Sequence, residues 1–185
     1  LNWGNTAATL ISAGGVAMPV AATSQFNFAV FFAPSTTVNG VGQSVALGSP
    51  LFSTVGQTNV NTTAAGRFAT RNGIAETTGT LAPGSTVDFI IRGWSASAGA
   101  TYAEALAFWN NGSPAADMYF GQSLVGNDFV LGGGPIGVSP LIGTGANSIQ
   151  SGFNMALVPG VVPAPSCLVL AGLGAASLLA FRRRN

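Results

Sequence analysis

Apolar and polar residues alternate with a period of two in three segments, which is the spacing of strands. These segments cover residues 24–32, 86–94 and 152–158. In the first, one predicted face carries Phe26, Phe28, Val30 and Phe32, and Phe31 interrupts the alternation. In the second, one face carries Val87, Phe89 and Ile91, and the other carries Asp88, Ile90, Arg92 and Trp94. In the third, the apolar positions are Phe153, Met155 and Leu157.

Shorter apolar runs give weaker strand predictions at 45–47, 51–55, 67–70, 118–120 and 128–131. Asn-Gly and Pro-Gly pairs between the runs are typical of turns. The stretch of Thr, Asn and Gly at 57–66 is interpreted as a surface loop. Short strands at this spacing predict a mainly β fold, an antiparallel β-sandwich or jelly-roll-like ectodomain over residues 1–158.

One short helix is expected within this β-rich region. Thr101 and Glu104 have the spacing of a capping box, in which each side chain satisfies a free backbone N–H at a helix start. Tyr102, Leu106 and Trp109 then recur on one helical face. The pattern predicts a helix over residues 102–109 that lies against an edge or end of the sheet.

The C-terminal segment, residues 159–185, has a different composition. Residues 168–181 carry no charge, and Arg182, Arg183 and Arg184 follow directly. Fourteen helical residues rise about 21 Å, which predicts a short single transmembrane helix with its C-terminus in the cytoplasm. Pro163 and Pro165 would keep the preceding segment extended outside the membrane. The alternatives are a plain membrane anchor and a buried hairpin helix.

Charge and reactive side chains are scarce. The chain holds 6 basic and 5 acidic residues among 185, with no His and one Cys. This composition argues against nucleic-acid binding. Because the chain has no His, it lacks the general base of Ser-His-Asp or Cys-His catalysis. The acidic residues are scattered from 76 to 128, so no pair at glycosidase spacing is evident. We therefore expect no enzyme activity, no cofactor and no metal site.

The second alternating segment also suggests a candidate ligand surface. Asp88 and Arg92 share a predicted strand face with Trp94, and Trp109 or Trp3 would add a flat aromatic ring. Aromatic rings with a few polar partners are common in carbohydrate sites. The alternative interpretation is a surface or edge ion pair beside a packed indole.

The C-terminal segment resembles the PEP-CTERM sorting signal of Gram-negative bacteria. The resemblance covers residues 161–185, with Val162, Pro163, Ala164, Pro165 and Ser166 ahead of the apolar span and the three arginines. Ala164 departs from the family, which usually has Glu there. The resemblance implies processing by exosortase, a membrane-embedded, cysteine-dependent enzyme that is thought to cleave near the proline motif.

This resemblance sets the functional expectation. The chain would be exported, held in the inner membrane with its C-terminus in the cytoplasm, and then displayed on the cell surface or in the extracellular matrix. Its implied partners are exosortase, membrane lipid and exopolysaccharide. The expected function is that of a non-enzymatic surface or matrix protein, and the alternative is a carbohydrate-binding module displayed at the cell surface.

Overall fold

The computed structural model describes the body of the chain with gaps. The described residues are 2–3, 10–14, 16–18, 25–38, 40, 42–69, 71–72, 81–111, 118–132, 137 and 140–157. The strands are β1 (Asn2–Trp3), β2 (Ser12–Ala13), β3 (Val16–Ala17), β4 (Phe26–Pro34), β5 (Thr54–Val60), β6 (Arg71–Asn72), β7 (Thr86–Ser95), β8 (Tyr119–Gln122), β9 (Gly126–Val130) and β10 (Asn154–Leu157). A 3-10 turn, η2 (Ala96–Ala98), precedes the helix α1 (Tyr102–Asn111).

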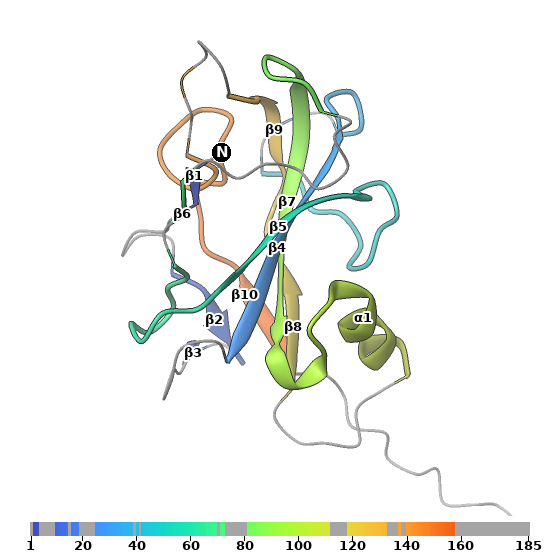
Figure 1. The fold of residues 1–185 in the computed structure, drawn as a ribbon, viewed down its shortest axis with the longest axis vertical. Coiled ribbons are helices and arrows are strands. Elements are labelled where there is room, and N and C mark those ends of the chain that lie inside the picture. Colours follow the sequence, from blue (N-terminus) through green and yellow to red (C-terminus); the bar gives the residue numbers. More distant parts are fainter. Residues whose placement is uncertain are drawn as a thin grey trace, which may run out of the picture.

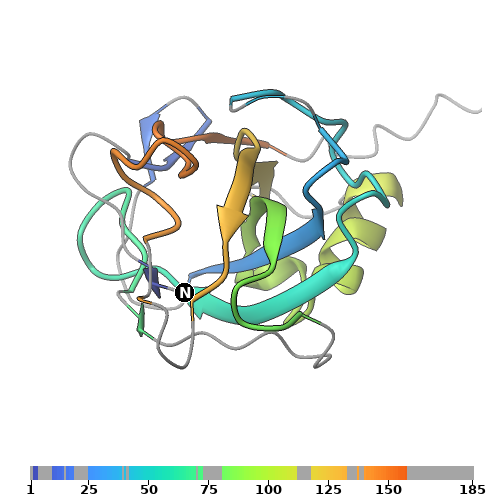
Figure 2. The same cartoon turned by 90° about the horizontal axis from the view of Figure 1, so that it is seen from above.

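One curled sheet organises the described strands. Its order is β3-β2-β10-β8-β7-β4-β5, and β9 adds a further pairing to β7. The β10–β2 pair is parallel, whereas the other pairs of this sheet are antiparallel. Figure 2 shows the sheet bending round on itself. The predicted mainly β class with a short helix is confirmed.

The predicted antiparallel sandwich differs from this arrangement. A sandwich needs two separate stacked sheets, but β7 pairs with β4, β8 and β9 and thereby links the described strands into one mixed sheet. A two-stranded pair of β1 and β6 stands apart from it. The period-two pattern indicates which residues share a face, and it carries no information about which strands become neighbours.

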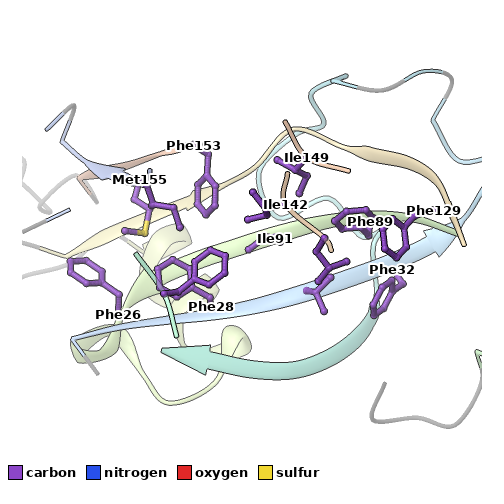
Figure 3. Packing of buried hydrophobic residues seen from close by; sticks show 14 of the residues in the cluster. Phe26, Phe28, Phe32, Phe89, Ile91, Phe129, Ile142, Ile149, Phe153 and Met155 are labelled. Carbon is purple, nitrogen blue, oxygen red and sulfur yellow. The ribbon is translucent and has the colours of Figure 1, made fainter. Parts of the chain in front are cut away.

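The concave side of the curl holds the larger apolar core. Phe28 and Phe89 are fully buried there, and Phe28 packs against Phe68 with ring centroids 5.4 Å apart. Met155 in β10 and Phe153 just before it lie near Phe28, whereas Phe89 packs against Phe129 at the other end of the core (Figure 3). The predicted inward positions of the first two segments all belong to this core. Leu157 does not, because 51% of its surface is exposed.

The opposite side of the sheet holds a second core. It contains Phe31, Ile90, Trp94 and Phe120, so the residue that interrupts the alternation of β4 is itself buried. Helix α1 and the loop before β5 cover this side, and both lie on the same side of β4 and β7 in Figure 1. Because both faces of β4 and β7 are covered, nearly every residue of these strands is buried.

Helix α1 begins where the capping pattern predicts. Glu104 accepts a hydrogen bond from the Thr101 backbone N–H at 3.0 Å, and the Thr101 hydroxyl accepts one from the Glu104 backbone N–H at 3.3 Å. The helix continues to Asn111, two residues beyond the predicted end, and packs on the second face of the sheet through Ala105. The prediction of a short helix is confirmed, but its predicted location at an edge or end of the sheet is wrong, because α1 packs on the second face.

The predicted surface loop at 57–66 is wrong in its first part. Residues Thr54–Val60 form β5, which pairs with β4 from Phe32↔Thr54 to Asn27↔Val60. Asn59 and Asn61 are buried, and Asn61 Oδ1 accepts a hydrogen bond from the Phe26 backbone N–H at 2.8 Å. Asn and Gly are depleted in strands, so their propensity concealed this strand.

The C-terminal prediction lies outside the described residues. These residues end at Leu157, ahead of the proline motif and the apolar span. Within the part of the chain that the structure describes, no helix has the length and apolar character needed to cross a membrane.

Candidate functional site

Arg92 lies in the middle of β7 and points into the second core. Only 1% of its surface is exposed. The guanidinium donates from Nη2 to the Ser49 carbonyl at 2.9 Å, from Nη1 to the Phe52 carbonyl at 3.4 Å, and from Nε to Gln122 Oε1 at 3.3 Å. All of these acceptors are uncharged. Within the described residues, Arg92 is thus a buried cation without an acidic partner.

Two aromatic rings flank the same guanidinium. Its Cζ atom lies 4.5 Å from the ring centroid of Phe31 and 4.7 Å from that of Tyr102. Burial lowers the pKa of Arg92, and the neighbouring Tyr102 partly offsets this effect. Burial likewise raises the pKa of Tyr102, and the positive charge of Arg92 opposes the rise. Cation–π contacts partly replace the hydration that Arg92 gives up.

The Tyr102 hydroxyl is the unsatisfied group of this cluster. Its oxygen is buried and has no hydrogen-bond partner within the described part of the chain. The ring packs against Phe31, with centroids 4.6 Å apart, and against Phe120, with centroids 5.7 Å apart. The ring is therefore fixed beside Arg92, with a free polar group at its end.

Asp88, four residues before Arg92, has a separate role. It is 0% exposed, and its Oδ2 accepts a hydrogen bond from the Val38 backbone N–H at 3.0 Å. Its Oδ1 accepts from Asn127 Nδ2 at 2.7 Å and from the Asp128 backbone N–H at 3.1 Å. Asp128 has a φ of 50°, an unusual conformation for a residue other than glycine. Asp88 thus fixes the loop after β4 and the start of β9.

The two tryptophans of the candidate surface are positioned differently. Trp94 is fully buried, and its Nε1 donates to the Gly99 carbonyl at 2.9 Å. Trp109 is half-buried near the end of α1 and stacks on Phe120, with centroids 5.5 Å apart and ring planes 29° apart. The side chain of Trp3 lies outside the described residues.

The predicted ligand surface is therefore wrong as an exposed patch. Asp88, Arg92 and Trp94 do share one face of β7 as predicted, but a helix and a loop cover that face. Trp109 alone of the four candidates keeps partial exposure. The alternative of an exposed ion pair is also wrong, because Asp88 and Arg92 bind different partners. The packed indole that this alternative also predicted is confirmed, because Trp94 is fully buried.

The covering loop includes a segment that we call the strap, residues 42–52. Its backbone binds the sheet through side chains of the second face: Arg92 at the Ser49 and Phe52 carbonyls, and Gln122 at the Val45 carbonyl at 2.7 Å. Two backbone hydrogen bonds also join the strap to Val125. The Gly42 N–H donates to the Val125 carbonyl at 3.1 Å, and the Val125 N–H donates to the Gln43 carbonyl at 2.8 Å. Polar contacts therefore hold the strap over Arg92.

Sequence reasoning missed three residues of this region. Gln122 and Asn127 reach the covering loop from β8 and β9, and Tyr102 contacts the guanidinium from α1. Only the position of Tyr102 on the apolar face of the predicted helix pointed toward the sheet. Within the described residues, no three side chains of the metal-binding types come together.

The sorting residues Val162 to Ser166 and the arginines Arg182 to Arg184 lie outside the described part of the chain. Their assignment continues to rest on the sequence. No model of a known protein family matches the chain, and no curated protein or solved structure is significantly similar to it.

Proposed function

We propose that this chain is an exported, non-enzymatic surface or extracellular-matrix protein. In this proposal, residues 168–181 anchor it as a single transmembrane helix, and an exosortase-type membrane enzyme then processes it near residues 162–166. The observation that carries the proposal is the order of features within 161–185: a Pro-Ala-Pro segment, an uncharged span and three consecutive arginines.

The physical role of each feature follows from its chemistry. A charged side chain costs about 2.5–3.5 kcal/mol at the bilayer centre, so three adjacent arginines oppose passage through the membrane. The apolar span is thereby held in the bilayer. Pro163 and Pro165 keep the segment outside extended, which is the backbone form that a peptidase-like active site accepts.

The organisation of the body supports the same proposal. Both apolar cores are built from residues that precede the tail, from Ile11 to Met155. The buried charged residues Asp88 and Arg92 form hydrogen bonds with loop backbone and thereby fix these loops to the sheet. A body of this kind would keep its fold after the tail is removed.

The test is the intact mass of the surface protein, produced from the full chain in hosts with and without the cognate exosortase. With the enzyme, we expect a mature form that ends near residues 162–166. Without it, we expect the anchored chain ending at Asn185. A mature form that still ends at Asn185 in the presence of the enzyme would show that the tail is only a membrane anchor.

Variants assign the two parts of the signal. Changing Arg182, Arg183 and Arg184 to Ser should let the chain pass through the membrane uncut. Pro163→Ala combined with Pro165→Ala should leave it anchored and unprocessed. The matched controls are Arg67→Ser and Pro50→Ala in the body, which should be processed like the natural chain.

A further inference from the structure

The strap presents to Arg92 the hydrogen-bond pattern of a carboxylate. The Ser49 carbonyl accepts from Nη2 and the Phe52 carbonyl accepts from Nη1, so one oxygen faces each terminal nitrogen. A carboxylate binds arginine in the same two-pronged manner, with its two oxygens on two parallel N–H groups. The two strap carbonyls therefore occupy both terminal nitrogens, which are nitrogens that a two-pronged carboxylate can use.

The strap is an imperfect substitute for such an anion. Its carbonyls are neutral, and the contact with Phe52 is long at 3.4 Å. Hydrogen bonds between arginine and a carboxylate are usually about 2.7–2.9 Å long and about twice as strong as neutral ones. Among the described residues, no acidic side chain supplies the missing negative charge. An anion at this position would gain an interaction that the strap does not provide.

The Tyr102 hydroxyl is a second polar group beside the same guanidinium. It is buried beside the guanidinium and has no hydrogen-bond partner within the described residues. Leaving a buried polar group unsatisfied costs about 1–3 kcal/mol, so native structures seldom do so. A carboxylate oxygen next to Arg92 would accept this hydroxyl hydrogen as well.

Most of the strap lies at the surface of the molecule. From residue 42 to 51 every strap residue is exposed or half-buried, and only Phe52 at its end is buried. Gly42 and Gly48 adopt positive φ values of 78° and 77°, which suit turns in an irregular segment. Lifting the strap would expose Phe52 and the partly buried Val45 and Leu47, and it would let water reach the buried cation.

We propose that Arg92 and Tyr102 form a concealed carboxylate-binding site, which the strap closes in the free protein and a carboxylate-bearing ligand opens. The ligand replaces the Ser49 and Phe52 carbonyls on the guanidinium and accepts a hydrogen bond from Tyr102. One positive charge matches one carboxylate, and the rings of Phe31 and Tyr102 hold the guanidinium in position.

Hydrogen exchange of the full chain tests this proposal without any variant. The chain is compared in sodium chloride, acetate, glucuronate and phosphate at equal pH and ionic strength. At a carboxylate concentration about ten times the dissociation constant of the open site, the open fraction rises about tenfold. The amides of Gly42, Ser49 and Val125, which are hydrogen-bonded at the strap, should then exchange about tenfold faster. Amides of β4 and β7 should not change.

The arms of this experiment separate the outcomes. Acceleration in both acetate and glucuronate means that the carboxylate group alone is recognised, and acceleration in glucuronate alone means that a sugar carrying it is required. Both results support the site. Equal acceleration in phosphate would overturn carboxylate selectivity. No acceleration, or acceleration of the core amides together with the strap, would overturn the site itself.

Two arginine variants complete the test. Arg92→Met keeps the bulk of the side chain and removes the charge, so the response to carboxylate should disappear. Arg67→Met removes a charge elsewhere on the body and should keep the full response. A carboxylate response that persists in Arg92→Met would show that the anion acts at another place.

Discussion

The two faces of the central strands are stabilised in contrasting ways. On the concave face, β4 and β7 present large apolar side chains and a glycine, and Phe28 fills the space above Gly93. On the other face, Asp88 and Arg92 alternate with Ile90 and Trp94. The first face is covered by close apolar packing, whereas the second is covered partly by helix α1 and partly by loop backbone that polar side chains bind. Shape complementarity therefore governs the first face, and hydrogen-bond complementarity governs much of the second.

The largest expected effects come from the concave face. Phe28→Ala and Phe89→Ala each remove a fully buried ring, so each should lower the free energy of unfolding by about 3–5 kcal/mol. Urea unfolding of the purified chain measures this loss. The control Leu157→Ala, at a position that is 51% exposed, should change stability by about 0.5 kcal/mol or less. Losses under about 1 kcal/mol for both phenylalanines would contradict the assignment of this core.

Asp88→Asn tests the polar face more directly. The carboxylate accepts three hydrogen bonds, one of them from the Val38 backbone N–H at Oδ2. An amide has only one oxygen, so an N–H group of the new side chain would face another N–H donor. We expect an intact fold that is less stable by about 1–3 kcal/mol, measured by urea unfolding.

Asp128→Asn is the matched control for this change. The carboxyl of Asp128 belongs to an exposed residue, and its φ of 50° is well tolerated by asparagine. Its stability should stay close to that of the natural chain. An equal loss in both variants would mean that net charge, rather than the hydrogen bonds of Asp88, determines the effect.

Arg92→Met is expected to lower stability less than the phenylalanine substitutions or Asp88→Asn. The variant loses three hydrogen bonds but also removes the cost of burying a cation without an acidic partner. Replacing buried charged groups by apolar ones of similar size is often close to neutral, so we expect a change within about 2 kcal/mol. Arg92→Ala should be less stable than Arg92→Met because it also opens a cavity. Thermal unfolding of the two variants side by side ranks them.

The same contrast explains how much of the fold the sequence could predict. Alternation assigned Val87, Phe89 and Ile91 to one face of β7 and Asp88, Arg92 and Trp94 to the other, and the structure confirms both sets. It also suggested that the polar set faces solvent, which is wrong. Alternation reports which residues lie together, but burial depends on whether a distant segment covers them.

The prediction of an exposed ligand surface was wrong because a distant segment, the strap, covers Arg92. The strap mixes small and polar residues with single apolar ones such as Val45 and Leu47, and it binds Arg92 through backbone carbonyls. Backbone groups are present at every residue, so no sequence pattern marks the ones that a buried side chain will use. The capping box at Thr101 and Glu104 was predictable because both of its partners are side chains at a fixed spacing.

The smallest expected effect is the pH response of this capping box. The backbone hydrogen bond from Thr101 lowers the pKa of Glu104 below its ordinary value of 4.5. A carboxyl group whose pKa is lower in the folded state stabilises the fold above its unfolded pKa. This stabilisation is lost as the pH falls through the folded value. Thermal unfolding from pH 6 to pH 3 should therefore show a decline in the natural chain that is weaker in Glu104→Gln.

Thr101→Ala distinguishes the hydrogen bonds of the box from its charge. It removes the hydroxyl that accepts from the Glu104 backbone N–H but keeps the backbone N–H that binds the carboxylate. We expect a loss of about 1 kcal/mol at neutral pH, typical for an N-cap substitution, with most of the pH dependence retained. If Thr101→Ala abolished the pH dependence and Glu104→Gln left it unchanged, the Glu104 carboxylate would not be the titrating group.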